Sequence, residues 1–372
     1  MLRIKHINAD ACFLITCLPS YAPENASESF PGSFSILVDP WLSGPSMVWH
    51  SRFAMTEHVE PACVESICEL PTPDVILISQ DKNDHCNQAT LTQLRPDIDT
   101  LILGTGAAVK KIKSWKHFNA DQVHALPRFE QRKEDAIFRI HLPPLSAKGL
   151  AGEVTIALLA PKADLVGLHN ALAVTYRAPS SVLSIVRNPS YRTEPVSAPT
   201  TRSGTPTLFS SRTRSPTPTA YSLRSFRSNI VPDERTLSFL FSPHGIDYDP
   251  LVLSYASSHL LQSSALPLTA LIHCLDGIDN PWYLGGSICS GSPSGIEIAK
   301  ALDAAVWIGA HDEEKVNSGI SLKLTFTKYD RAEVRKKIAA VDADYLVGDA
   351  HRSGMTELVE LDPGEEVCIR PG

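Results

Sequence analysis

A strand, a short polar loop and a helix follow one another between residues 74 and 94, and this junction constrains the fold more than any other stretch. Val75–Ile78 is a run of four apolar residues, which is typical of a strand buried in a parallel sheet. A polar loop follows it, and Asn87 is a residue type that begins helices as an N-cap. Asp84 and His85 end the loop, where they offer a carboxylate and an imidazole. The junction predicts an α/β protein whose loop carries candidate metal-binding residues.

Short apolar runs alternate with helical patterns through most of the chain, and this alternation favours a single domain over residues 1–372. We expect strands over Leu2–Ile7, Cys12–Thr16, Ser35–Val38, Val75–Ser79, Thr100–Leu103, Ala136–His141, Val154–Leu159, Thr236–Phe241, Ala270–Cys274, Ala305–Ile308, Tyr345–Val347 and Glu366–Ile369. We expect helices over Asn87–Leu94, Ala107–Trp115, Leu251–Leu261, Gly295–Leu302 and Arg331–Val341. Two halves, each of strands followed by helices, predict a four-layer αββα sandwich.

Residues 177–230 interrupt this alternation. Ser, Thr, Pro and Arg make up 35 of the 52 residues from Arg177 to Ser228, with no apolar periodicity. Such a segment buries too little apolar surface to offset its conformational entropy, so a disordered insertion is expected. One interpretation is a tolerated surface loop. The other is a site for a protein partner or a kinase, because three hydroxyl-proline pairs lie among the arginines and phosphorylation would cancel their charge.

Charge and cysteine usage narrow the class of protein. The formal net charge is −7, and since the insertion carries eight Arg and one Glu over residues 177–228, the rest of the chain carries −14. An acidic body does not favour nucleic acid as a partner. No apolar run approaches the roughly 18–20 residues that a membrane span needs, so no membrane association is expected. Eight scattered cysteines without a secretory signal predict a cytoplasmic protein with free thiols.

Four short motifs occur in an order that is specific as a set, although each is weak alone. The first is Asp39 at the end of the strand around residues 36–38, and the second is the loop containing Gln80, Lys82, Asp84 and His85. The third is Ser-Pro-His-Gly with His244, and the fourth is Trp307–Asp312 with His311. In this order the chain resembles the metallo-β-lactamase fold superfamily, nearest its lactonase-like branch (the ascorbate-6-phosphate lactonase type) and fungal relatives of that branch.

The resemblance implies a degenerate metal site. The superfamily's loop reads H-x-H-x-D-H and supplies ligands to two metal ions, whereas this chain has Gln80 and Lys82 at the first two positions. An ammonium has no lone pair for a metal, so the first metal site is expected to be lost. Asp84, His85 and His311 would hold one divalent ion, with His244 in place of the bridging acid. The expected ion is zinc, with manganese or iron as alternatives.

Two functions remain open from the sequence. The first is a metal-dependent hydrolase of a small-molecule substrate, namely an ester, a lactone or a phosphorylated metabolite. In it Asp84 and Lys82 would be catalytic, with the Lys82 ammonium near the position of the missing ion, where it would neutralise Asp84 or hold an anionic group. The alternative is a non-catalytic pseudoenzyme that binds no metal and serves as a binding or scaffold protein through its insertion. In that case Asp84 and His85 would organise the loop, and His311 would be a strand-end histidine.

Overall fold

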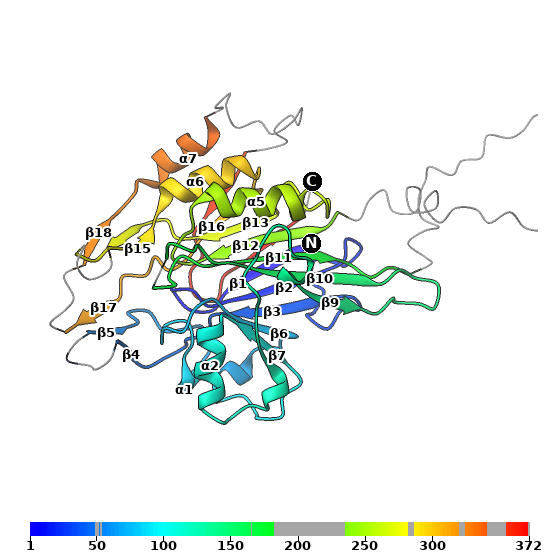
Figure 1. Cartoon of the computed structure of the whole chain (residues 1–372), viewed down its shortest axis with the longest axis horizontal. Helices are drawn as coiled ribbons and strands as arrows, with labels where there is room; N and C mark the ends of the chain where they lie inside the picture. The colour runs from blue at the N-terminus through cyan, green and yellow to red at the C-terminus, as the bar shows by residue number, and fades with distance from the viewer. Residues whose placement is uncertain are drawn as a thin grey trace, which may run out of the picture.

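Two seven-stranded sheets face one another, and helices cover the outer side of each (Figure 1). The computed structural model describes residues 1–48, 52, 54–164, 166–181, 235–281, 286–319, 324–340 and 355–370. The first sheet has the order β20-β1-β2-β3-β6-β7-β8. Its strands are β1 (Leu2–His6), β2 (Phe13–Cys17), β3 (Phe34–Val38), β6 (Val75–Ile78), β7 (Leu101–Gly104), β8 (Val123–Ala125) and β20 (Glu366–Ile369).

The second sheet has the order β19-β16-β13-β12-β11-β10-β9. Its strands are β9 (Phe138–Leu142), β10 (Gly152–Leu159), β11 (Ala171–Arg177), β12 (Leu237–Ser242), β13 (Ala270–His273), β16 (Val306–Gly309) and β19 (Glu357–Val359). Two three-stranded sheets flank one end of the sandwich; they are made of β14 (Gly277–Asp279), β15 (Ser287–Ser290) and β18 (Thr325–Thr327), and of β4 (Ser46–Val48), β5 (Ala54–Glu57) and β17 (Val316–Ser318).

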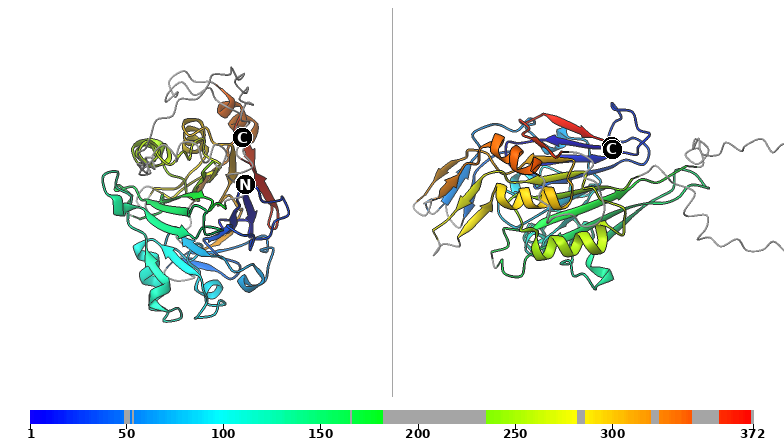
Figure 2. Two further views of the ribbon diagram at one scale, coloured as in Figure 1. Left: turned by 90° about the vertical axis from the view of Figure 1, so that its right-hand side faces the viewer. Right: turned by 90° about the horizontal axis from the view of Figure 1, so that it is seen from above.

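Helices form the two outer layers. On the first sheet lie α1 (Gln88–Leu91) and α2 (Gly106–Ser114), and on the second lie η4 (Tyr248–Val252), α5 (Leu253–Tyr255), η5 (Ala256–Leu260), α6 (Ser292–Ala301) and α7 (Arg331–Ala339) (Figures 1 and 2). The single-turn helices η1 (Ile67–Glu69), η2 (Ala120–Gln122) and η3 (Glu134–Ala136) lie in connections. Asn87 and Thr105 cap α1 and α2 by accepting hydrogen bonds from Thr90 N and Ala108 N.

Three buried clusters fill the spaces between the four layers. Alternation along β6 shows how one strand serves two of them: Val75 and Leu77 face the other sheet, whereas Ile76 and Ile78 face α1 and α2. A third cluster joins the second sheet to its helices, with Trp307 of β16 fully buried in it. Each buried Val, Leu or Ile stabilises the fold by about 1.5–3 kcal/mol. The four-layer αββα sandwich that the sequence predicts is thereby confirmed.

Several expected boundaries shift. Strand β11 runs to Arg177, which pairs with Glu153 of β10, so the first residue of the predicted insertion belongs to the second sheet. The remainder of that insertion, residues 182–230, lies outside the described residues, as does the strand expected at 345–347. The helix expected over 251–261 forms as the consecutive segments η4, α5 and η5, which run from Tyr248 to Leu260 with a non-helical Asp249 near the start. No helix in the described parts of the chain is long and apolar enough to cross a membrane.

Candidate metal centre

Asp84, His85, His244 and His311 come together at the carboxyl ends of β6, β12 and β16. One potential ligand atom from each lies within 4.8 Å of every other. The three imidazoles stand close to one another, with ring centroids 4.2 Å apart for His244 and His311 and 4.9 Å apart for His85 and His244. All three histidines are buried, whereas the Asp84 side chain is 21% exposed and forms the open side of the cluster.

His85 and His244 each use one ring nitrogen for support and turn the other toward the cluster. The Nδ1 of His85 lies 2.7 Å from Asp39 Oδ2, and the Nδ1 of His244 lies 2.9 Å from the carbonyl oxygen of Ile288. Both supports are acceptors, so both Nδ1 atoms donate and both Nε2 atoms face the centre of the cluster. These two Nε2 atoms are 2.9 Å apart, the distance of a hydrogen bond in which one imidazole carries the shared proton. A metal ion bound by both nitrogens would take the place of that proton.

His311 is supported by a carboxylate from the other sheet. Its Nδ1 lies 2.7 Å from Oδ1 of Asp10, in the turn between β1 and β2, and its backbone N–H donates to the Asp10 carbonyl oxygen. Lys315 places its Nζ 2.7 Å from the same Oδ1. Burial opposes ionisation of Asp10, but the neighbouring His311 and Lys315 charges hold its pKa well below the ordinary value. Asp10 is therefore an ionised carboxylate that orients His311.

Asp39 supports the loop and binds His85 without joining the cluster. Its carboxylate accepts hydrogen bonds from the backbone N–H of Ser79 at 2.7 Å, from the Ser79 hydroxyl and from His85. Asp39 therefore orients His85 and holds the start of the loop that follows β6.

The charges around the cluster favour metal binding. Burial would raise the pKa of Asp84, but nearby His85 and Lys315 lower it, so the side chain is a carboxylate. Burial, together with the charges of His311 and His85, holds the pKa of His244 well below its usual value. Its imidazole is therefore neutral and can coordinate a cation through Nε2. Burial lowers the pKa of His85, but the charges of Asp84 and Asp39 outweigh burial, so the pKa is raised overall.

Lys82 pairs with Asp81 and not with Asp84. Its Nζ lies 2.9 Å from Oδ1 of Asp81, and the side chain is 36% exposed. The carbonyl oxygen of Lys82 accepts from His85 N and Cys86 N, so its backbone belongs to the turn that precedes α1. The ammonium that does lie beside the histidines is that of Lys315, with Nζ 3.2 Å from His311 Nδ1.

Sequence reasoning missed Asp10 and Lys315. No local pattern singles them out, because both act through contacts with residues that are distant in the sequence. Sequence reasoning also did not predict the surroundings of Gln80, whose carboxamide is buried and has no hydrogen-bond partner among the described residues. Cys86, which follows His85, is buried under the helix layer, and burial raises its pKa to about 12. Such a thiol is unreactive at neutral pH.

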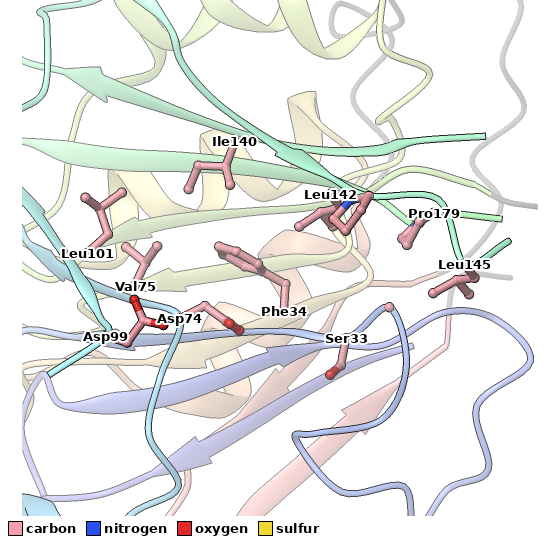
Figure 3. A pocket seen from close by; sticks show the side chains of 12 residues that line it. Ser33, Phe34, Asp74, Val75, Asp99, Leu101, Ile140, Leu142, Leu145 and Pro179 are labelled. Carbon is pink, nitrogen blue, oxygen red and sulfur yellow. The ribbon is translucent and has the colours of Figure 1, made fainter. Parts of the chain in front are cut away.

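One cavity of the sandwich adjoins the cluster. It has a volume of about 300 Å³ and is lined by His311, by the apolar Phe326 and Ile278, and by charged residues of both signs, namely Lys315 and Lys328 together with Asp276, Asp312, Glu313 and Glu314. The larger cavity, about 490 Å³, lies at the other end of the sandwich, where Phe34 and Val75 begin β3 and β6 (Figure 3). Because the ligand cluster follows the opposite ends of these strands, the larger cavity does not reach it, whereas the smaller cavity is lined by the ligand His311.

The donor set fits one divalent ion. Three imidazole nitrogens and one carboxylate oxygen are ligands that zinc, manganese and ferrous iron accept. Each imidazole is oriented by an acceptor on its other nitrogen, as is usual in metal sites. The cluster is buried on three sides and open at Asp84, so a small molecule can approach it.

Comparisons with known proteins give structural likenesses and no family. No family model matches the chain, and no curated protein matches it. An isothiocyanate hydrolase from gut bacteria of Delia radicum is similar at 15% identity and a TM-score of 0.48, covering 99% of this chain and 100% of that one. A metallo hydrolase from the hyperthermophilic archaeon Ignicoccus hospitalis gives 10% and 0.39, with 98% and 97% covered.

The metallo-beta-lactamase fold protein YhfI of Bacillus subtilis gives 11% identity and a TM-score of 0.41, with 99% of each chain covered. At these identities and TM-scores, what the chain binds and does has to follow from its own side chains.

Proposed function

We propose that this protein is a metal-dependent hydrolase with one divalent ion held by Asp84, His85, His244 and His311. The observation that carries the proposal is the convergence of four ligand atoms within 4.8 Å, from residues whose other ring nitrogens are already engaged. Zinc is the ion that we infer, with manganese and ferrous iron as alternatives for the same donor set. The finer assignment to a lactonase-like enzyme rests on the motif order in the sequence.

The chain's own residues would position a substrate at this centre. A divalent ion in such a site supplies Lewis-acid chemistry, which acidifies water and polarises a carbonyl or phosphoryl oxygen. Asp84, with its partly exposed carboxylate, can accept a proton from a water molecule at the open side of the cluster. The adjoining cavity of about 300 Å³ has the size of a small-molecule site. The proposed substrate is an ester, a lactone or a phosphorylated metabolite, the class that the resemblance implies; the cavity wall carries four acidic residues beside Lys315 and Lys328, which favours the uncharged members of that class.

Metal content tests the proposal. Protein purified without a metal-affinity column is analysed by plasma mass spectrometry, for the wild type, His85→Ala and His124→Ala. His124 lies on β8, and its Nε2 hydrogen bonds to the carbonyl oxygen of Asp121, outside the cluster, so it is the control. We expect about one equivalent of metal in the wild type and in His124→Ala, and loss of the metal in His85→Ala.

Hydrolysis is then assayed with p-nitrophenyl esters, simple lactones and p-nitrophenyl phosphate. Turnover that disappears in His85→Ala but not in His124→Ala supports the hydrolase. Metal binding without turnover of any of these substrates would instead indicate a binding protein, the alternative that the degenerate loop allows. Absence of metal from all three proteins after incubation with zinc, manganese and iron would refute the proposal.

A further inference from the structure

Phe326 of β18 and Ile278 of β14 form an apolar pair in the wall of the cavity of about 300 Å³. The two residues are direct partners in the antiparallel register of these strands, so their side chains lie on the same face of the small sheet. Phe326 is 50% exposed and Ile278 is partly buried. Both therefore present apolar surface to a molecule in the cavity.

The row of side chains that contains the apolar pair continues to a proposed metal ligand. Ile278 also pairs directly with Cys289 of β15. Cys289 is buried, and its Sγ lies 3.7 Å from Nδ1 of His244. The ligand His311 lines the same cavity as the apolar pair. A molecule that packs against Phe326 and Ile278 therefore lies beside the ligand cluster.

The charged side chains of the cavity wall are already engaged by other groups of the protein. Lys315 lies 2.7 Å from Asp10, and the more exposed Lys328 and Glu314 lie 3.1 Å from one another. The three remaining carboxyl groups have partners of their own, namely the His58 ring and the Val59 and Glu60 N–H groups for Glu313, the Leu275 and Asp276 N–H groups for Asp312, and Arg331 and the Tyr329 N–H group for Asp276.

These contacts determine which chemical class the cavity favours. A charged group loses water when it enters a cavity, and this loss is compensated only where it finds a partner of opposite charge. Here such a partner is obtained only by breaking a contact that the protein already makes. Acidic residues also outnumber the two lysines of the wall, which disfavours an anion. An uncharged molecule avoids both costs, and burial of its alkyl or aryl group against the apolar pair stabilises the complex.

We propose that the substrate is an uncharged ester or lactone with an alkyl or aryl group, and that Phe326 and Ile278 bind this group beside the metal ligands. The inference rests on the proposed metal-dependent hydrolysis and narrows its substrate class, since phosphorylated and other anionic metabolites are excluded. The apolar pair contacts a part of the substrate that does not react. Its removal should therefore raise KM and leave kcat nearly unchanged.

Esterase kinetics with a graded series of substrates test this inference. Zinc-loaded wild type, Phe326→Thr, Phe326→Leu and Leu261→Ala are assayed with p-nitrophenyl acetate, butyrate and hexanoate, and with p-nitrophenyl phosphate as the anionic comparison. Thr removes the ring and keeps the strand preference, whereas Leu keeps an apolar contact. Leu261 is the matched control, because it is an apolar residue that is 63% exposed and directly follows η5 in the outer helix layer.

The expected result is a preference for the longer acyl chain that depends on Phe326. In the wild type, KM should fall about tenfold from acetate to hexanoate, and kcat/KM for the phosphate should be lower than for any ester by about tenfold or more. Phe326→Thr should raise KM for hexanoate about tenfold and keep kcat within about twofold. Phe326→Leu and Leu261→Ala should retain the preference of the wild type. Equal KM values along the series, or an unchanged preference in folded Phe326→Thr, would overturn the inference alone.

A binding measurement separates this inference from the proposed function. 2-Octanone is an uncharged ketone with a hexyl chain and cannot be hydrolysed. It is titrated into metal-free wild type, Phe326→Thr and Leu261→Ala and followed by NMR, with the hexanoate anion in parallel. We expect 2-octanone to bind more tightly than hexanoate, and to bind Phe326→Thr about fivefold more weakly than the other two proteins. Binding of this kind without turnover of any ester would overturn the proposed function but support the ligand class, whereas tighter binding of hexanoate would overturn the ligand class.

Discussion

Asp39 and His311 adopt backbone conformations that residues other than glycine rarely adopt. Their φ angles are 40° and 61°, and each residue lies just after a strand. Conformations of this kind cost about 1–3 kcal/mol each and persist only where the surroundings enforce them. Here they do: Asp39 N donates to Leu77 O, and His311 N donates to Asp10 O. The strain turns one carboxylate and one imidazole away from their strands and toward the cluster.

Gln80 allows a test of how much an unpaired buried carboxamide lowers the free energy of unfolding. Its buried carboxamide has no hydrogen-bond partner among the described residues, and an unsatisfied buried polar group costs about 1–3 kcal/mol. We expect Gln80→Leu to raise the free energy of unfolding by about 1 kcal/mol and to leave the metal content unchanged. Urea unfolding in the presence of Zn²⁺ measures the first and plasma mass spectrometry the second.

Gln93→Leu is the matched control for that experiment. The Gln93 Oε1 accepts from Ser66 Oγ and Ile67 N, so its removal should destabilise the protein. If Gln80→Leu is destabilised to the same extent, the Gln80 carboxamide has a partner that stabilises the fold, and our interpretation of this residue is wrong.

Single residues also show where prediction from the sequence ends. Asp84, His85, His244 and His311 could be named because each follows an apolar strand in a motif. The roles of Asp10 and Lys315 depend on a contact between residues about 300 positions apart, which no local pattern encodes. Lys82 was placed by motif position alone, and its backbone turn directs the side chain to Asp81 instead.

At the scale of elements, Gly245 determines how β15 packs against His244. Its φ is 80°, and a Cβ there would lie 1.9 Å from Ser290 Oγ, on the strand that also supplies the Ile288 carbonyl to His244. We expect Gly245→Ala to push β15 away from His244. The variant should lose about 3 kcal/mol of stability, and its zinc affinity should fall, as measured by thermal unfolding and by titration.

Gly286 separates the two causes of that effect. Its φ is 73°, close to that of Gly245, but nothing lies within 4 Å of the position that a Cβ would take. Gly286→Ala should therefore carry only the conformational cost, about 1 kcal/mol, and bind zinc like the wild type. Equal losses in the two variants would mean that the contact with Ser290 contributes nothing.

Element boundaries were predictable where a cap or a strong apolar run defines them. The last strand, Glu366–Ile369, agrees with its expected bounds, and Asn87 caps α1 as expected. Strand β11 was not expected, because its run Ala171–Arg177 adjoins the Ser- and Pro-rich segment and was partly assigned to it. The small strands beside the cavity were also missed, since three-residue strands give too short a pattern to recognise.

At the scale of the whole molecule, the register of β11 and β12 implies that the long segment between them is not required for the sandwich. Tyr176 pairs directly with Leu237, so the two ends of the connection already lie side by side. We expect a protein lacking residues 182–234 to fold with the same circular dichroism spectrum. It should gain up to about 2 kcal/mol from the lower entropy of loop closure, which thermal unfolding would detect. Failure of this variant to fold would refute a single domain interrupted by an insertion.

The proposed ligands come from both sheets. His85 follows β6 of the first sheet, whereas His244 and His311 follow β12 and β16 of the second. An ion bound by all of them would link the two halves of the sandwich and would favour the folded state by mass action. The gain is about 2.7 kcal/mol when free metal reaches about 100 times its dissociation constant. The lifetime of this protein inside a cell would then depend on the local zinc supply. Metal starvation would inactivate the protein and would also make it more susceptible to proteolysis.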